Sequence, residues 1–222
     1  HLDKGRGMKT IYCISGLGAD ERAFSKLSIR GYELKVIHWL LPEADETLQA
    51  YAVRMRSGIK EENPILMGLS FGGMVCTEIA KQIPVEKIIL ISSIKSYREL
   101  PFWMKAVARL KLNKIVPLKS SKLTQPIQNR MLGVETAEEK TLVASFRREV
   151  DLPYTNWAVH QAINWKNDWQ HPDTCHIHGD NDHMFPIKYI KPTYTIKNGG
   201  HFMIMNRADE VSSYINAALQ CS

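Results

Sequence analysis

Apolar runs of strand length alternate with stretches of helical spacing along most of the chain. Compact runs rich in β-forming residues predict six strands, at 9–15, 33–39, just before Ser70, 87–93, 174–178 and 192–197. Apolar residues three and four positions apart predict helices between them, at 19–27, 48–55, 74–82 and 207–219. Strands that alternate with helices are typical of an α/β fold, in which a mostly parallel sheet of about six strands carries helices on both faces.

Residues 94–170 interrupt this alternation. They contain no convincing strand, and helical spacing covers 102–112, 137–150 and 154–165. We expect a helical insertion that lies as a lid over the carboxyl ends of the strands, where open α/β sheets bind their ligands. With 222 residues, 44% of them hydrophobic, the chain is long enough for one sizeable core. Residues 8–222 are therefore predicted to form a single domain, and residues 1–7 resemble a vector-derived remnant ahead of Met8.

The apolar stretches and the cysteines indicate the kind of compartment. No apolar stretch approaches the length of a membrane span, so we expect a soluble, cytoplasmic protein. The four cysteines show no paired spacing, which makes disulfides and structural zinc unexpected. They are Cys13, Cys76, Cys175 and Cys221.

The net charge of +6 is concentrated in one segment. Residues 95–150 hold twelve Lys or Arg and five Asp or Glu, a surplus of +7, and the rest of the chain comes to −1. Solvated helix faces account for such a surplus without any function, and this is the interpretation that we favour. The alternative is that the segment attracts an anionic substrate or surface. No nucleic-acid-binding motif accompanies the charge, so nucleic acid is not a predicted partner, and the oligomeric state is open.

The motif Gly68-Leu69-Ser70-Phe71-Gly72 joins the third predicted strand to the helix that follows it. A strand that becomes a helix within two residues bends sharply, and the bend imposes strained dihedral angles on the serine. The two glycines remove Cβ atoms that would collide there. The serine hydroxyl is thereby held at a helix N-terminus, where free N–H groups favour developing negative charge. Serine is also a common N-cap, so the motif indicates chemistry only together with a base and an acid.

A serine nucleophile requires a base within hydrogen-bond reach and a third group that orients the base. Of the eight histidines, His201 follows the last predicted strand and a Gly-Gly pair, at the same edge of the sheet as Ser70. A histidine after two glycines is also a common turn residue, but this position favours the base. The acid is expected in the loop after the fifth strand, where Asp180 and Asp182 compete. Asp182 lies further from the strand and is favoured, while Asp180 has the position of a turn-capping residue.

With these residues the chain resembles the α/β-hydrolases over nearly the whole of residues 8–222. The glycine turn, the Gly-x-Ser-x-Gly nucleophile elbow, the acid loop and the histidine loop stand in that family's order. Gly179-x-x-Asp182 followed by Pro186 resembles the family's acid loop, which selects Asp182 over Asp180. The predicted sheet is minimal, because it lacks the antiparallel pair that leads the family's larger sheets.

The resemblance implies a Ser-His-Asp acyl-enzyme mechanism that needs neither a cofactor nor a metal. It also implies an oxyanion hole made by two backbone N–H groups, those of Leu17, in the turn after the first strand, and Phe71, which follows the nucleophile. Many members have His-Gly in that turn, whereas this chain has Ser15-Gly16, so the support of the turn is open. We expect a carboxylesterase-like protein that hydrolyses a small ester or thioester.

The pocket for the acyl substrate is expected under the insertion. Aromatic residues of the insertion are candidates for its wall, although aromatic residues at helical spacing more often pack in a core. The candidates are Phe102, Trp103, Trp157 and Trp165.

Three other interpretations stand beside this one. His176-x-His178-x-Asp180 resembles the start of a metallo-hydrolase motif, but Asn181 stands where that motif has its next histidine, so no metal is predicted. Members of the same fold also run cofactor-free lyase or C–C hydrolase chemistry with this triad. A non-catalytic ligand-binding protein is the third alternative, although a binder has no need of all three triad residues.

Overall fold

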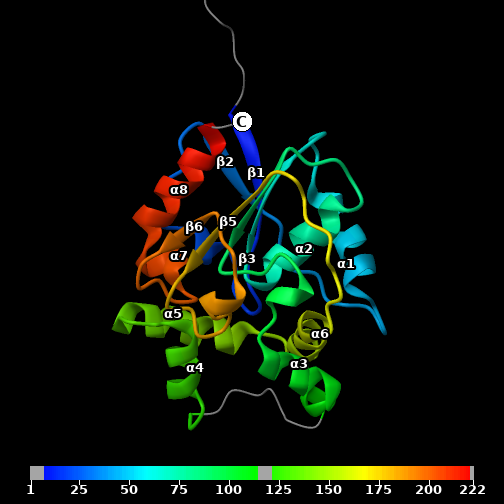
Figure 1. Ribbon diagram of the computed structural model, residues 1–222, viewed down its shortest axis with the longest axis vertical. Coiled ribbons are helices and arrows are strands. Elements are labelled where there is room, and N and C mark those ends of the chain that lie inside the picture. The colour runs from blue at the N-terminus through cyan, green and yellow to red at the C-terminus, as the bar shows by residue number, and fades with distance from the viewer. Residues whose placement is uncertain (1–7, 115–121, 221–222) are drawn as a thin grey trace, which may run out of the picture.

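A single sheet forms the centre of the molecule, with all neighbouring strands parallel and in the order β2-β1-β3-β4-β5-β6 (Figure 1). The computed structural model describes residues 8–114 and 122–220. The strands are β1 (Lys9–Ile14), β2 (Tyr32–Val36), β3 (Ile65–Leu69), β4 (Lys87–Ile91), β5 (Thr174–Gly179) and β6 (Tyr194–Ile196). The predicted α/β class and the six-stranded parallel sheet are confirmed.

The strand order changes direction at β1. The chain leaves β1 to one side for β2 and returns to the other side for β3, so the carboxyl ends of β1 and β3 are neighbours, with Ile14 paired to Gly68. In open α/β sheets, ligands bind in the crevice at such a switch point. Ser70 follows β3 directly, and the fold therefore places it where a binding site is expected.

Helices cover both faces of the sheet and divide the apolar side chains into two cores. On one face lie α1 (Leu48–Met55) and α2 (Phe71–Ala80), and on the other lie α7 (Met203–Asn206) and α8 (Ala208–Gln220). Strands β3 and β4 are buried along their whole length because both of their faces are covered. This double burial explains their almost continuously apolar sequences.

The helix predicted at 19–27 is wrong, because only a 3-10 turn forms there, η1 (Glu21–Phe24). Beyond the turn, the backbone finds hydrogen-bond partners on α8. The N–H of Ser28 donates to Ser212 Oγ at 3.0 Å. Such bonds to a neighbouring helix replace those that a longer helix would have supplied to its own backbone.

Between β4 and β5 the described chain is helical and lies across the carboxyl ends of the strands (Figure 1). Its helices are α3 (Phe102–Arg109), α4 (Gln125–Leu132), α5 (Ala137–Glu149) and α6 (Leu152–Ile163). Val143 and Phe146 of α5 belong to the core on the side of α8, whereas Met104 of α3 and Tyr154 of α6 belong to the core on the side of α2. The insertion therefore closes both cores at one end of the sheet.

The three described cysteines, Cys13, Cys76 and Cys175, are buried free thiols. Burial raises the pKa of each thiol, so none of the three presents an accessible thiolate. The predicted remnant 1–7 and Cys221 lie outside the described residues. None of the helices in the described residues combines the length and the hydrophobicity that a bilayer span requires.

Candidate active site

Ser70 occupies the turn between β3 and α2 in a backbone conformation that is rare for residues other than glycine. Its φ and ψ are 52° and −120°. The turn is tight, because a Cβ added to Gly68 would lie 2.4 Å from Gly73 Cα. The N–H of Ser70 donates to Ile91 O at 2.9 Å, and its carbonyl accepts from Ser93 Oγ at 2.6 Å. Hydrogen bonds to β4 and to the loop after it thus hold the strained serine in place.

The amino end of α2 packs against the end of β1. A Cβ on Gly72 would lie 2.2 Å from the carbonyl oxygen of Ile14 and 2.5 Å from that of Ser15. Gly72 is therefore required for the approach of α2 to β1, rather than for relief of crowding within the serine turn. The same approach brings the turn after β1 to the serine, since a Cβ on Gly16 would lie 3.3 Å from Ser70 Cβ.

His201 joins Ser70 to Asp182 through both of its ring nitrogens. Its Nε2 lies 2.9 Å from Ser70 Oγ, and its Nδ1 lies 2.8 Å from Asp182 Oδ2. When the neutral ring carries its proton on Nδ1, it donates to Asp182 and accepts from the Ser70 hydroxyl. Asp182 and His201 are buried and Ser70 is half-buried, so water screens their interactions only weakly.

The loops after β5 and β6 bring Asp182 and His201 together through direct backbone contact. A Cβ on Gly179 would lie 2.0 Å from the carbonyl oxygen of Gly199, so only glycine fits at 179. The N–H of Asn181 donates to the same carbonyl at 3.0 Å. The two loops are therefore packed as one unit at the sheet edge.

Of the two candidate acids, the structure brings only Asp182 to the histidine. Asp180 is exposed, and its Oδ1 accepts from the N–H of Asn198 at 2.6 Å. Asp180 thus caps the neighbouring turn, whereas the Asp182 carboxylate points at His201.

Asp182 is held as a carboxylate although it is buried. Burial raises its pKa, but the electrostatic interaction and hydrogen bond with His201, the electrostatic interaction with His178 and the hydrogen bond from Phe185 outweigh this effect and lower the pKa below its usual value. The N–H groups of Met184 and Phe185 donate to Asp182 Oδ1 at 2.8 Å each. An ionised carboxylate in this position stabilises the imidazolium that forms when the histidine takes up a proton.

The two amides predicted as an oxyanion hole belong to turns that touch each other. Leu17 follows Gly16, which contacts Ser70, and Phe71 follows Ser70 directly. Within the described residues, neither amide donates a hydrogen bond to another backbone or side-chain group. Both N–H groups are thus free to bind an oxygen that carries negative charge.

Trp39 supplies the support for the turn after β1 that the sequence left open. Its Nε1 donates to Ser15 Oγ at 2.9 Å, and Ser15 Oγ donates to the carbonyl of Ala19 at 2.7 Å. The indole ring also stacks on Phe71, with 5.6 Å between ring centroids. Trp39 therefore connects the two turns whose amides are the predicted oxyanion hole. Its position after β2, the strand beside β1, is a sequence signal that could have pointed to this role.

Solved structures of the same architecture are numerous. A bromoperoxidase from Bacillus anthracis superposes with a TM-score of 0.70 at 15% identity, over 96% of this chain and 92% of that one. A thermophilic esterase from Thermogutta terrifontis gives 0.69 at 15%, over 96% and 89%, and MenH from S. aureus gives 0.66 at 16%, over 98% and 95%. This chain has the α/β-hydrolase fold. No protein-family model matches the sequence, and neither does any curated protein.

In this α/β-hydrolase fold, the four aromatic candidates for the pocket wall have different surroundings. Trp157 packs edge-on against Phe71, with ring centroids 6.1 Å apart. Trp165 is buried, and its indole N–H donates to the Glu78 carboxylate of α2. Phe102 and Trp103 are exposed. Of the four, Trp157 is the residue that contacts the neighbour of Ser70.

Two buried histidines of β5 lie behind the Asp182 carboxylate. His178 Nε2 donates to Phe185 O at 2.8 Å and lies 3.5 Å from Asp182 Oδ2. His176 Nε2 donates to Ser93 O at 3.0 Å, and the two rings are 5.3 Å apart. Burial lowers the pKa of both rings, which favours their neutral forms. Among the described residues, no three His, Cys, Asp or Glu side chains converge as metal ligands would.

The insertion is fastened to the loop that carries His201. The N–H of Phe202 donates to the carbonyl of Leu132, at the end of α4, with a distance of 2.7 Å. Asn206 Nδ2 donates to the carbonyl of Gly133 at 3.0 Å. The position of the histidine therefore depends on the insertion as well as on the sheet.

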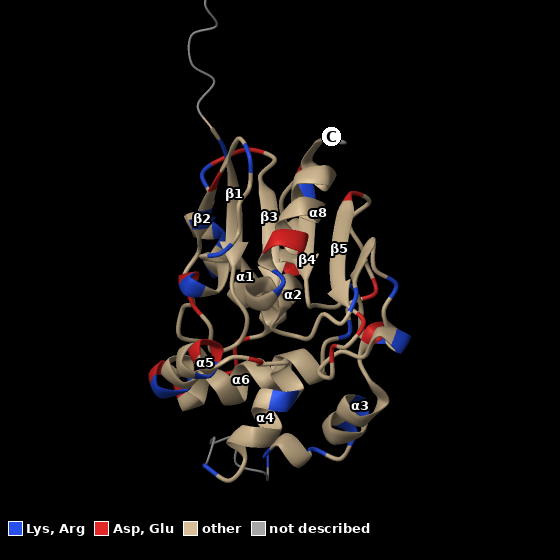
Figure 2. Ribbon diagram, turned by 90° about the vertical axis from the view of Figure 1, so that its left-hand side faces the viewer, with Lys and Arg blue, Asp and Glu red and all other residues tan. Residues whose placement is uncertain are grey.

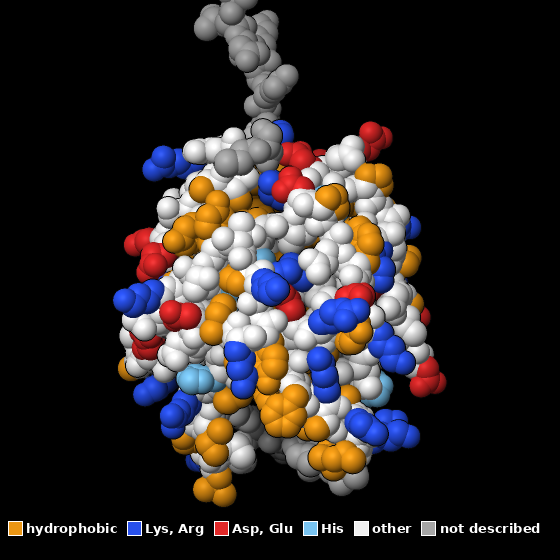
Figure 3. Space-filling view, viewed as in Figure 1, with side chains coloured by type: hydrophobic (Ala, Val, Ile, Leu, Met, Phe, Trp, Pro, Cys, Tyr) orange, Lys and Arg blue, Asp and Glu red, His pale blue; other side chains and the backbone are white. Residues whose placement is uncertain are grey.

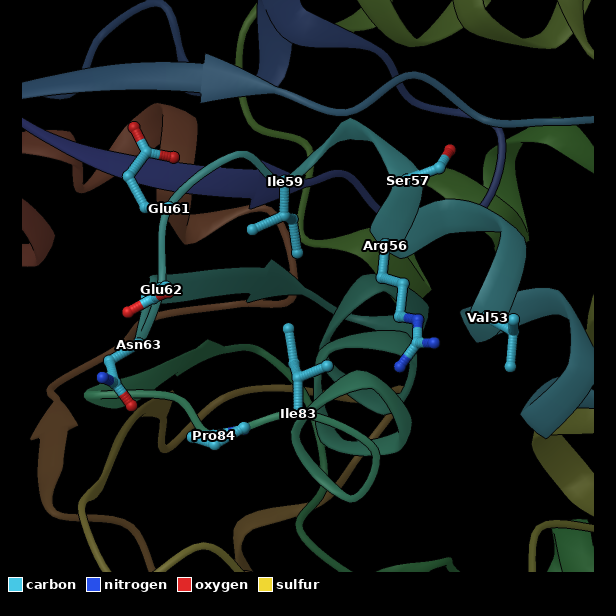
Figure 4. Close-up of a pocket in the computed structure, with 9 residues that line it drawn as sticks. All are labelled: Val53, Arg56, Ser57, Ile59, Glu61, Glu62, Asn63, Ile83 and Pro84. Atoms are coloured by element: carbon cyan, nitrogen blue, oxygen red, sulfur yellow. The ribbon is translucent and has the colours of Figure 1, made fainter.

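A separate pocket of about 670 Å³ opens at the other end of the sheet (Figure 4). Ile59 and Ile83 point toward each other across it, and Asn63 lines it just before β3. Because β3 runs from this end to Ser70, and each strand residue adds about 3.3 Å, roughly 17 Å of strand separates the two places. The pocket is not part of the candidate active site.

Proposed function

We propose that this protein is a serine hydrolase that cleaves a small carboxylic ester or thioester through an acyl-enzyme. The proposal is carried by the hydrogen-bonded chain that runs from Ser70 Oγ through His201 to Asp182 at the switch point of the sheet. The presence of an esterase among the proteins of similar structure is consistent with an ester substrate.

In the proposed acylation step, Ser70 Oγ attacks the substrate carbonyl while His201 Nε2 takes the hydroxyl proton. Asp182 accepts the Nδ1–H bond throughout and stabilises the imidazolium. The N–H groups of Leu17 and Phe71 bind the oxyanion, and the loss of one such donor typically costs about 3–4 kcal/mol of transition-state stabilisation. The imidazolium then protonates the departing alcohol or thiol as the carbonyl of the acylated serine re-forms.

Deacylation repeats the same proton movements with water as the nucleophile. His201 takes a proton from water, whose oxygen attacks the acyl carbonyl. The collapse of the second tetrahedral intermediate releases the carboxylic acid, and the imidazolium returns the proton to Ser70 Oγ. The cycle uses the side chains of this chain and water, and it draws on no cofactor.

We further propose that the insertion covers the acyl pocket as a lid and that Trp157 forms part of the pocket wall. Trp157 lies against Phe71, the residue that directly follows the nucleophile along the chain. A wall of aromatic rings beside two amide donors suits an acyl group with an apolar chain and a polar carbonyl.

A fluorophosphonate probe and short p-nitrophenyl esters test the proposal together. The wild type is expected to be labelled and to turn over the esters, Ser70→Ala to do neither, and Ser25→Ala, an exposed serine after η1, to match the wild type. No labelling of folded wild type contradicts the nucleophile and favours a ligand-binding protein. Labelling without turnover across a panel of acyl esters and CoA thioesters favours lyase or C–C hydrolase chemistry.

A further inference from the structure

The far end of the insertion exposes large apolar side chains. Phe102 is 70% exposed and Leu123 is 90% exposed. Half of the large apolar side chains that are exposed in the described residues come from α3, the turn after it and the α4 region, and they are Phe102, Trp103, Leu110, Leu112, Leu123 and Ile127. Single exposed apolar residues are ordinary, but a concentration of them marks an interaction surface.

The same stretch is strongly basic. Residues 100–134 contain seven Lys or Arg and no Asp or Glu, which exceeds the net charge of the whole chain. Figure 2 shows Lys and Arg on α3 and α4 and no acidic residue on either helix. The basic side chains in the described part are all exposed, and none forms an ion pair with a described residue; they are Lys105, Arg109, Lys111, Lys114, Lys122 and Arg130.

We propose that these six apolar and six basic residues, the basic end face, dock onto the surface of an anionic phospholipid bilayer. Figure 3 shows apolar and basic side chains intermingled at the lower end of the molecule, the end away from the amino terminus. Apolar side chains of this kind enter the boundary between headgroups and acyl chains, while Lys and Arg attract anionic headgroups. Trp103 has the amphipathic ring that is enriched at this depth of a membrane.

Charge favours a bilayer over a second copy of this chain as the occupant of the basic end face. Two copies meeting through this face would bring their unpaired cations together, and the repulsion opposes such a dimer. An anionic bilayer instead supplies the opposite charge over a wide area and needs no matching carboxylate at a fixed position. The apolar side chains then insert among the lipid headgroups, and this insertion requires no preformed groove on the protein.

Docking would also orient the candidate active site. The basic end face belongs to the insertion, which lies over the carboxyl ends of the strands and contacts the loop that carries His201. The membrane proposal does not depend on the hydrolase proposal, because binding to vesicles is measured without any substrate.

Co-sedimentation of the full chain with vesicles tests the proposal. We expect binding to phosphatidylcholine mixed with phosphatidylglycerol, no binding to phosphatidylcholine alone, and weaker binding as salt is added. The paired change Lys111→Glu with Lys114→Glu is expected to lower the affinity at least about tenfold. The pair Phe102→Ser with Leu110→Ser is expected to have a similar effect at unchanged charge.

Matched controls change the same residue types elsewhere. Lys26→Glu with Lys197→Glu alters the net charge equally at exposed positions, and Leu41→Ser removes an apolar side chain that is 67% exposed. Both controls are expected to bind like the wild type, and circular dichroism checks that every variant is folded. The proposal is overturned if the wild type does not bind the mixed vesicles, or if the control lysine pair loses as much binding as Lys111→Glu with Lys114→Glu. It is also overturned if sedimentation velocity shows a dimer that Phe102→Ser with Leu110→Ser dissociates.

Discussion

Gly133 touches Gly200, the residue before His201, because a Cβ added to Gly133 would lie only 3.0 Å from the Cα of Gly200. Gly133 ends α4 in the left-handed region, with a φ of 71°. The insertion thus meets the histidine loop backbone to backbone, and the space available at this contact sets where the loop lies.

Replacing Gly133 with alanine is expected to impair turnover beyond its effect on stability. The left-handed conformation costs an alanine about 1–2 kcal/mol, and the added Cβ also pushes against the loop of His201. Gly31→Ala is the matched control, since its φ is 76° and nothing lies within 4 Å of its added Cβ. Both variants should lose unfolding free energy in urea, with the larger loss in Gly133→Ala, and only Gly133→Ala should lose kcat. Equal kcat values would show that this contact does not position His201.

Asp182→Asn is expected to lower kcat by about four powers of ten while leaving the fold intact. The amide cannot stabilise an imidazolium, and it removes the acceptor that sets the tautomer of His201. Asp180→Asn should have a mild effect, because Asp180 only caps a turn through Asn198. Steady-state kinetics with a p-nitrophenyl ester compares the two, and equal losses would overturn the choice of acid.

Trp39→Phe is expected to lower kcat by about tenfold with little change in KM. Phenylalanine keeps an aromatic ring against Phe71 but loses the hydrogen bond to Ser15 Oγ, so the turn that carries Leu17 becomes less rigid. Trp165→Phe is the control, because it loses an indole hydrogen bond, to Glu78 Oε1 in α2, that is not part of this turn. The assignment of Trp39 fails if kcat is unchanged or if only KM rises.

His176 and His178 are expected to make the folded state less stable as the pH falls. Burial lowers the pKa of both rings below the ordinary value near 6.5, and for His176 the charges of His178 and Lys95 lower it further. Below about pH 6.5 the rings of the unfolded chain take up protons, while the buried rings stay neutral. The folded state has its full stability above the pKa of the unfolded chain. It loses stability as the pH falls from that value toward the folded pKa, at up to about 1.4 kcal/mol per pH unit for each ring.

Urea unfolding between about pH 5 and pH 7 measures this dependence. His176→Gln should flatten the slope of unfolding free energy against pH, whatever its effect on stability at pH 7. His38→Gln is the comparison variant, because it removes a ring that is 71% exposed instead of a buried one. An unchanged slope in His176→Gln would contradict the role given to its burial.

The six strands could be predicted because most of them are compact apolar runs between turn-forming residues, although the predicted runs 33–39 and 192–197 are longer than β2 and β6. The central strands β3 and β4 are buried on both faces and read as continuous apolar sequence. The loops that carry Ser70, Asp182 and His201 follow predicted strands, so a shared sheet edge was deducible from parallel topology. The distances between these side chains could not be deduced from the sequence, because they depend on close approaches such as that of Gly179 to Gly199.

Helix α4 and residues 19–27 depart from the prediction for opposite reasons. Helix α4 has no buried residue, and Ile127 is 68% exposed, so it lacks the apolar stripe from which helices are read. Residues 19–27 have that stripe but form only the 3-10 turn η1, and beyond them the N–H of Ser28 donates to Ser212 of α8. The role of Trp39 likewise depends on contacts between segments that are distant along the chain.

Helices α3, α5 and α6 tie together two hydrophobic layers that the sheet otherwise keeps apart. If these helices moved away from the sheet as one rigid body, water would reach Val143 and Phe146 in one core and Met104 and Tyr154 in the other. At about 25 cal/mol per Å² of apolar surface, exposing four such side chains costs several kcal/mol. We therefore expect small molecules to reach and leave Ser70 through local fluctuations at the edge of the insertion, and not through a hinged opening of the insertion as a whole.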